Sequence, residues 1–130
     1  MEIDFITSNK GKIAALKRSF LNAGRFDIKV NQVQADIVEP QLNNIADVSK
    51  YKAMEAFKIL KKPILVEDGG LVIEALNGFP GPYTKYVLST IGIDGILKLM
   101  NGENNRAAKF VSFATFVGND GTVYQFERFG

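Results

Sequence analysis

Residues 64–70 read Ile-Leu-Val-Glu-Asp-Gly-Gly and decide how the rest of the chain is interpreted. Three successive apolar residues predict a short strand covered on both faces, as in a parallel sheet. Glu67 and Asp68 would then lie at the carboxyl end of that strand, where open α/β sheets build their sites. A solvated acidic turn, bent at Gly69 and Gly70, is the equally weighted alternative for the acids alone. The apolar strand before them favours a site.

The chain before this stretch predicts a β-α-β unit. Residues 3–7 form an apolar run, and residues 12–23 carry apolar side chains at helical spacing and end before a glycine. Residues 26–30 alternate apolar and charged, which is typical of a half-buried strand. A second helix is expected over residues 45–61, because its apolar spacing ends before a proline.

The chain after it predicts a rigid loop, two helices and a hairpin. Residues 76–83 contain two glycines and two prolines, and residues 84–91 and 94–100 have helical spacing. Residues 109–117 and 122–129 flank an Asn-Asp-Gly turn, a strong hairpin signal. We therefore expect one α/β domain over residues 1–130, with a mixed central sheet and flanking helices.

Composition restricts the chemistry. The chain has 130 residues, no cysteine and no histidine, which excludes a thiolate nucleophile, a zinc ribbon and a histidine base. Carboxylates and lysines remain, and they suit phosphate chemistry with Mg²⁺. A net charge of +2 is too small for a nucleic-acid footprint, and no apolar run approaches a membrane span. The missing cysteines fit a cytoplasmic protein.

Thr7, Ser8, Asn9 and Lys12 lie where the first strand gives way to the first helix. Backbone N–H groups, hydroxyls and a lysine at a helix start form an anion site, so a phosphate would fit there. A simple helix cap with solvated lysines explains the same residues equally well. The pattern is not a P-loop, because the Gly-x₄-Gly-Lys-Ser/Thr spacing is absent.

Two further segments carry candidate side chains. Lys52 lies among the apolar positions of its helix, near Glu39 in sequence, and either binds an anion or extends its charge into water; spacing alone favours water. In residues 77–85, the rings of Phe79 and Tyr83 either face a base or fill the core.

These segments, in this order, resemble the inosine triphosphate pyrophosphatase family, whose enzymes remove non-standard purine triphosphates. Thr7-Ser8-Asn9 with Lys12 is similar to the family's Thr-x-Asn-x-x-Lys opening, and residues 67–71 to its acid-Asp-Ser-Gly-Leu signature. Residues 75–81 match its Ala-Leu-Asn-Gly-x-Pro-Gly loop. Glu-Pro-Gln at 39–41, Tyr-Lys-Ala at 51–53 and Asn-Arg-Ala-Ala-Lys-Phe at 105–110 also fit, closest to archaeal-type members.

The resemblance implies a two-lobed α/β fold, frequently a homodimer, that hydrolyses ITP, dITP or XTP to the monophosphate and pyrophosphate. It implies Asp68, Lys12 and Lys52 as catalytic residues, and Glu39, Glu67 and Asp68 as Mg²⁺ ligands. The substrate-binding set that it implies is Thr7, Ser8, Asn9, Lys12, Lys52, Gly69, Gly70, Phe79, Pro80, Gly81, Tyr83 and Thr84.

The chain departs from the family pattern in three places. Gly69 replaces the usual serine, and Pro82 and Thr84 replace an aliphatic residue and a serine. Family members also continue past the hairpin with segments that select the 6-keto group of the purine. We therefore expect this chain to lack the C-terminal base-recognition part of the family. A weak or inactive nucleotide-binding remnant that self-associates is the alternative function.

Overall fold

The order of the strands determines where a site can form. The structure is a computed structural model and describes residues 1–129. Its strands form one sheet in the order β2-β1-β3-β4-β5. They are β1 (Glu2–Ile6), β2 (Lys29–Val33), β3 (Ile64–Ile73), β4 (Ala108–Val117) and β5 (Val123–Phe129). β1 pairs in parallel with β2 and β3, whereas β3, β4 and β5 pair antiparallel. The expected mixed sheet is confirmed.

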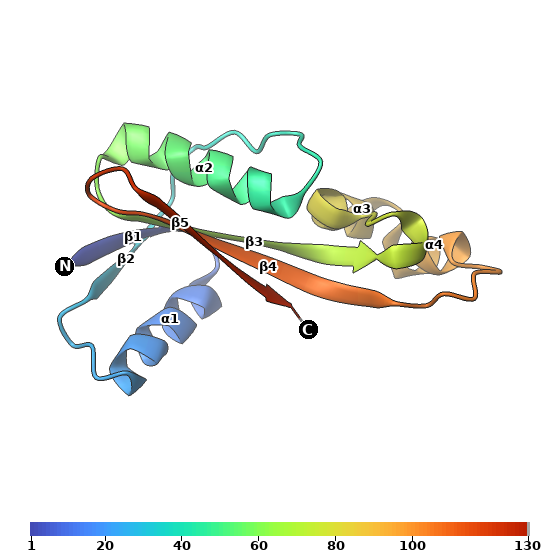
Figure 1. Ribbon diagram of the computed structural model, residues 1–130, viewed down its shortest axis with the longest axis horizontal. Helices are drawn as coiled ribbons and strands as arrows, with labels where there is room; N and C mark the ends of the chain where they lie inside the picture. Colours follow the sequence, from blue (N-terminus) through green and yellow to red (C-terminus); the bar gives the residue numbers. More distant parts are fainter. Residues whose placement is uncertain (130) are drawn as a thin grey trace.

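Helices flank this sheet on both faces (Figure 1). They are α1 (Lys10–Asn22), α2 (Ile45–Leu60), α3 (Thr84–Thr90) and α4 (Gly92–Leu99), with short 3-10 turns η1 (Glu74–Leu76) and η2 (Gly81–Tyr83). α1 and α2 lie on opposite faces near β1, and α3 and α4 lie beside the far end of β3 and β4 (Figure 1). No helix among residues 1–129 is long and apolar enough to cross a membrane.

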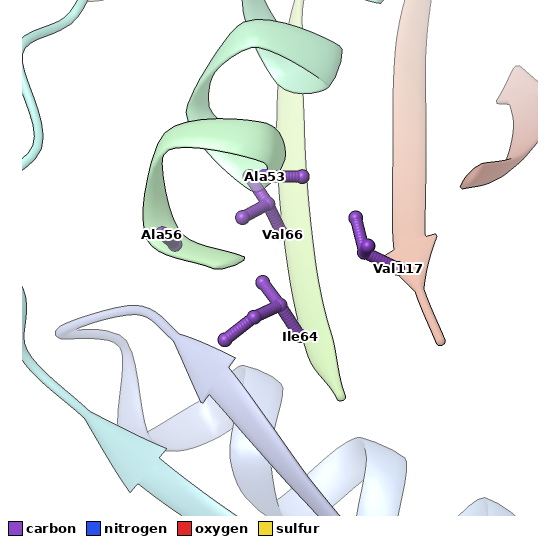
Figure 2. Close-up of a cluster of buried hydrophobic side chains, with 5 residues drawn as sticks. All are labelled: Ala53, Ala56, Ile64, Val66 and Val117. Carbon is purple, nitrogen blue, oxygen red and sulfur yellow. The ribbon is translucent and has the colours of Figure 1, made fainter. Parts of the chain in front are cut away.

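Small side chains on α2 bring this helix close to the sheet. Ala53 and Ala56 are completely buried and pack against Ile64, Val66 and Val117 (Figure 2). Next to this cluster, the Ser49 hydroxyl lies 2.8 Å from the Thr115 hydroxyl, and Gln125 Nε2 donates to Thr115 Oγ1 at 2.9 Å. The buried hydroxyls of Ser49 and Thr115 thus satisfy each other, and Gln125 Nε2 also donates to the Ala46 carbonyl at 2.9 Å, so α2 is held over β4 and β5.

Two strands differ from the expectation by more than two residues. β2 begins at Lys29 rather than at Phe26, whose side chain is 78% exposed. The segment before it turns, with the Arg25 guanidinium donating to both Asp27 carboxylate oxygens; this hydrogen bond lowers the pKa of Asp27 to about 2. β3 does not end at Glu67 but continues to Ile73, because β4 pairs with it along its whole length.

One edge of β3 is paired with a neighbouring strand only at its start. β1 pairs with β3 only at Ile64 and Leu65, so within residues 1–129 no strand pairs with the later residues of β3 on that side. There the Leu71 amide donates to Thr84 Oγ1 at 2.9 Å, and the Thr84 hydroxyl donates to the Gly81 carbonyl at 2.7 Å. η2 and the start of α3 thus cover the edge further along.

Gly70 permits this close contact. A β-carbon on Gly70 would collide with the Gly81 carbonyl oxygen and would lie 2.8 Å from Thr84 Oγ1. A β-carbon on Gly69 would have no heavy atom nearer than 3.2 Å. We expect Gly70→Ala to lower the free energy of unfolding by about 1–3 kcal/mol, as in other overpacked cores. Urea denaturation measures the change.

Gly69→Ala is the matched control, because it adds the same methyl group one residue earlier on the strand. It should change the unfolding midpoint much less than Gly70→Ala. Equal midpoints for the two variants would contradict the packing role of Gly70.

Candidate active site

The candidate site is a cleft at the carboxyl end of β1, where the chain passes from β1 to β2 on one side and reaches β3 on the other. Such switch points form crevices in open α/β sheets. We call this the acidic cleft; its volume is about 630 Å³. Its charged and polar lining comprises Thr7, Ser8, Asn9, Gln34, Lys12, Glu39, Lys52, Glu67, Asp68 and Lys85.

Asn9 shapes the start of α1. Its Oδ1 accepts hydrogen bonds from the backbone amides of Gly11, at 2.9 Å, and Lys12, at 3.2 Å. Its own amide donates to Thr7 Oγ1 at 3.0 Å. Asn9 is thus a helix cap, as one of the two interpretations held, and it also lines the cleft. Capping fixes the first turn of α1, which carries Lys12 to the cleft.

Lys52 and Asp68 form the most buried ion pair of the cleft. Lys52 Nζ lies 2.7 Å from Asp68 Oδ1 and 3.6 Å from Glu39 Oε1. The side chains of Lys52 and Asp68 are 21% and 13% exposed, whereas that of Glu39 is 63% exposed. Lys52 therefore binds anions within the protein, and the expectation that spacing favoured, a charge extended into water, is wrong. The carboxylates lie on the neighbouring strand and loop, which helix spacing cannot reveal.

Glu67 and Asp68 point to opposite faces of the sheet. Successive side chains of a strand alternate, so Asp68 meets Lys52 on α2 while Glu67 Oε1 meets Lys12 Nζ on α1 at 3.3 Å. Both can line one cleft because β1 has ended and leaves the edge of β3 open between the two faces. The two helices each provide a lysine to this edge.

The acids do not yet form a metal-ligand group. Within residues 1–129, no three acidic side chains lie close enough together to hold a metal ion. Glu39, Glu67 and Asp68 share the cleft, but each is paired with a lysine. However, Asp68 Oδ2 is buried and accepts no hydrogen bond from any described residue. A carboxylate oxygen in that position needs a cation or a donor, so these oxygen ligands fit a hard divalent ion.

The glycine- and proline-rich loop contributes less to the cleft than its sequence suggested. Phe79, Pro80, Gly81 and Tyr83 line a separate hollow of about 520 Å³, which we call the loop hollow. Gly70 and Thr84 do not line the cleft, and Thr84 instead forms hydrogen bonds with Leu71 of β3 and with Gly81. The binding roles of these residues remain predictions.

Lys85 is the last residue of the candidate segment 77–85, but no role was assigned to it from the sequence. It lies in the first turn of α3 and lines the acidic cleft together with Pro82. No described residue pairs with its ammonium group. Only the adjacent glycine- and proline-rich loop hinted that the chain turns back towards the acids at this point.

The sequence and the fold agree with one family. A sequence model of the Ham1 family matches residues 3–128. The dITP/XTP pyrophosphatases of Methanopyrus kandleri and Pyrococcus horikoshii are 46% and 42% identical over 112 and 126 residues. These alignments cover 86% and 97% of this chain, but 58% and 66% of those proteins. The chain thus spans about three fifths of the length of such relatives.

Solved structures have the same fold. The nucleoside-triphosphatase / dITP/XTP pyrophosphatase of Mycobacterium abscessus superposes with a TM-score of 0.86 at 24% identity, covering 99% of this chain and 71% of that one. The Staphylococcus aureus Ham1 protein superposes with a TM-score of 0.84 at 26% identity, covering 99% and 69%. The resemblance noted in the motifs is confirmed, and the chain belongs to the Ham1 family.

Proposed function

We propose that this chain hydrolyses non-standard purine nucleoside triphosphates, such as ITP, dITP and XTP, to the nucleoside monophosphate and pyrophosphate. The observation that carries the proposal is the Lys52–Asp68 pair beside a buried, unpartnered Asp68 Oδ2. Family membership and the dITP/XTP pyrophosphatase activity named for the relatives support the substrate class.

The charge of the cleft fits a polyphosphate only together with a cation. Three lysines face three carboxylates across the cleft, so the described side chains balance one another. A triphosphate would add several negative charges, which we propose Mg²⁺ offsets at Asp68, with Glu67 and Glu39 as further ligands. When bound, the ion would neutralise phosphate charge and polarise a phosphoryl oxygen.

The residues of the chain would position the reactants. Asn9, Lys12 and Lys52 would hold phosphate oxygens, since ammonium and amide groups neutralise and orient a transferring phosphoryl group. Lys52 fixes the Asp68 carboxylate through Oδ1; one lone pair of Oδ2 would face the metal ion, and the other would accept a proton from an attacking water molecule. The water oxygen would bond to the α-phosphorus as the bond from this phosphorus to the bridging oxygen breaks, and pyrophosphate would leave.

The first test measures pyrophosphate release from ITP, dITP, XTP, ATP and GTP in the presence of Mg²⁺. Asp68→Asn keeps the shape of the side chain but removes the proton acceptor, so kcat should fall about 10²–10⁴-fold, the usual contribution of a general base. Asp36→Asn is the matched control, because Asp36 is exposed and does not line the cleft.

Equal release by the wild type and Asp68→Asn would contradict the catalytic role of Asp68. Binding of ITP without release of pyrophosphate would instead favour the nucleotide-binding remnant.

The second test concerns the metal. If Asp68 Oδ2 ligates Mg²⁺, the ion should stabilise the wild type and so raise its Tm. At a Mg²⁺ concentration 100 times the Kd, the free energy of unfolding should increase by about 2.7 kcal/mol. Asp68→Asn should lose most of this shift, whereas Asp36→Asn should retain it. Thermal unfolding with increasing MgCl₂, against a CaCl₂ series, gives the measurement.

A shift of the same size in both variants would place the bound ion elsewhere.

Cytoplasmic location and homodimer formation remain predictions.

A further inference from the structure

Three polar side chains join α2 to β4 and β5 on the face of the sheet that carries Asp68. Ser49 and Thr115 are completely buried, and their hydroxyl oxygens lie 2.8 Å apart. Ser49 Oγ also donates to the Phe113 carbonyl at 3.3 Å, and Gln125 Nε2 donates to Thr115 Oγ1 at 2.9 Å. We call Ser49, Thr115 and Gln125 the polar bridge, because they connect one helix with two strands.

The number of available protons fixes the direction of each hydrogen bond in the polar bridge. A hydroxyl has one proton to donate, and a carbonyl oxygen only accepts. Ser49 therefore uses its proton on the Phe113 carbonyl. Thr115 must then donate to Ser49, while its own oxygen accepts from Gln125. Removal of either hydroxyl leaves a buried group of the other residue without its partner, which is costly.

The polar bridge contacts β4 directly opposite the part of β3 that holds Asp68. Phe113 pairs with Asp68 in the ladder between β3 and β4, and Thr115 pairs with Val66. Residues two apart on a strand lie on the same face, so Thr115, Val66 and Asp68 all face α2. Ser49 is thus hydrogen-bonded to the region of the sheet from which the Asp68 carboxylate extends.

Lys52 depends on the position of α2 for its contact with Asp68. It follows Ser49 by three residues, so the two side chains lie on one side of the helix, and its Nζ lies 2.7 Å from Asp68 Oδ1. The four-carbon stem of a lysine is flexible and does not fix this distance. Ala53 and Ala56 bring α2 close to the sheet (Figure 2), but apolar contacts are non-directional. The directional hydrogen bonds of the polar bridge therefore restrain where Lys52 meets the sheet.

Resting on the proposed function, we propose that Ser49 and Thr115 are positioning residues for the release of pyrophosphate. Their hydrogen bonds hold α2 at the height over β4 at which Lys52 fixes the Asp68 carboxylate. Neither Ser49 nor Thr115 lines the acidic cleft. Both therefore act through Lys52 and Asp68 rather than on the substrate.

Two substitutions of Thr115 separate positioning from stability. Thr115→Val keeps the shape of the side chain but replaces the hydroxyl by a methyl group. Because a carbon–oxygen contact needs about 3.3 Å or more, this methyl group should push Ser49, and α2 with it, away by roughly 0.5 Å. Thr115→Ser keeps the hydroxyl and removes a methyl group. It leaves the polar bridge intact while the cavity lowers the stability.

The kinetics of pyrophosphate release from ITP with Mg²⁺ give the first readout. Thr115→Val should lower kcat about tenfold, since a displacement of about 1 Å can cost about 10²-fold. KM should change less, because Asn9 and Lys12 keep their positions. Thr115→Ser should retain the kcat of the wild type even though its urea midpoint falls. A merely structural role would instead make kcat follow the urea midpoint in both variants.

Ser49→Ala removes the hydroxyl on the helix side of the polar bridge, and Ser19→Ala is its matched control. Ser19 is an exposed serine of α1 whose hydroxyl donates to the Ala15 carbonyl of the same helix. Ser49→Ala should lower kcat, whereas Ser19→Ala should not. In an Asp68→Asn background, Ser49→Ala should have little further effect on kcat, because substitutions that act through one another are not additive.

A second readout does not require activity. Urea unfolding of Lys52→Met, Asp68→Asn and their combination gives the coupling free energy of the ion pair. This coupling should be smaller in the Thr115→Val background than in the wild-type or Thr115→Ser background, because α2 has moved away from β3.

Three outcomes overturn the inference: equal loss of kcat in Thr115→Val and Thr115→Ser, an equal effect of Ser49→Ala with and without Asp68→Asn, or an unchanged ion-pair coupling in Thr115→Val. Absence of pyrophosphate release by the wild type would instead overturn the proposed function. The coupling free energy would then decide alone whether the polar bridge positions Lys52.

Discussion

The unequal lengths of β1 and β3 are the constraint on which the site depends. β3 has ten residues and pairs with β4 along all of them, but β1 pairs with β3 at only two. Just beyond that point no strand of the described chain pairs with this edge of β3, so residues that point to opposite faces of the sheet can line a common space. If β1 were longer and paired with β3 at these positions, the side chains of Glu67 and Asp68 would be separated by the sheet. Side-chain alternation normally separates neighbouring residues of a strand. Because β1 ends early, Glu67 and Asp68 point to opposite faces of β3 and still line the same cleft.

The electrostatics of the cleft follow from this geometry. α1 and α2 lie on opposite faces, and each brings one lysine to the open edge. Ion pairs that are partly buried keep the carboxylates and ammonium groups in fixed positions, because leaving either charge alone in such a place is costly. Under the proposed function, ligand binding would exchange partners: phosphate would replace the carboxylates at the lysines, and a cation would replace the lysines at the carboxylates. Asp68 Oδ2, which accepts no hydrogen bond from a described residue, is where this exchange would begin.

Local patterns predicted the elements well, but not their ends or their partners. The helix period over residues 45–61 and the Asn-Asp-Gly hairpin specify structure within a few residues, and α2, β4 and β5 follow those predictions closely. β3 was expected to stop before Glu67, because Gly69 and Gly70 look like a bend. Its length is instead set by β4, which lies about forty residues later in the chain. Likewise, spacing places Lys52 among core positions of α2 but does not identify Asp68 as its partner.

The two adjacent glycines illustrate why sequence motifs alone leave roles open. Gly70 faces the Gly81 carbonyl and Thr84, so its lack of a side chain allows η2 and α3 to cover the edge of β3. A β-carbon on Gly69 would have no heavy atom within 3 Å, and Gly69 lines the acidic cleft. One glycine therefore serves packing, and the other lies in the wall of the cleft. Because strand residues alternate in direction, adjacent positions with the same residue type can experience unrelated constraints.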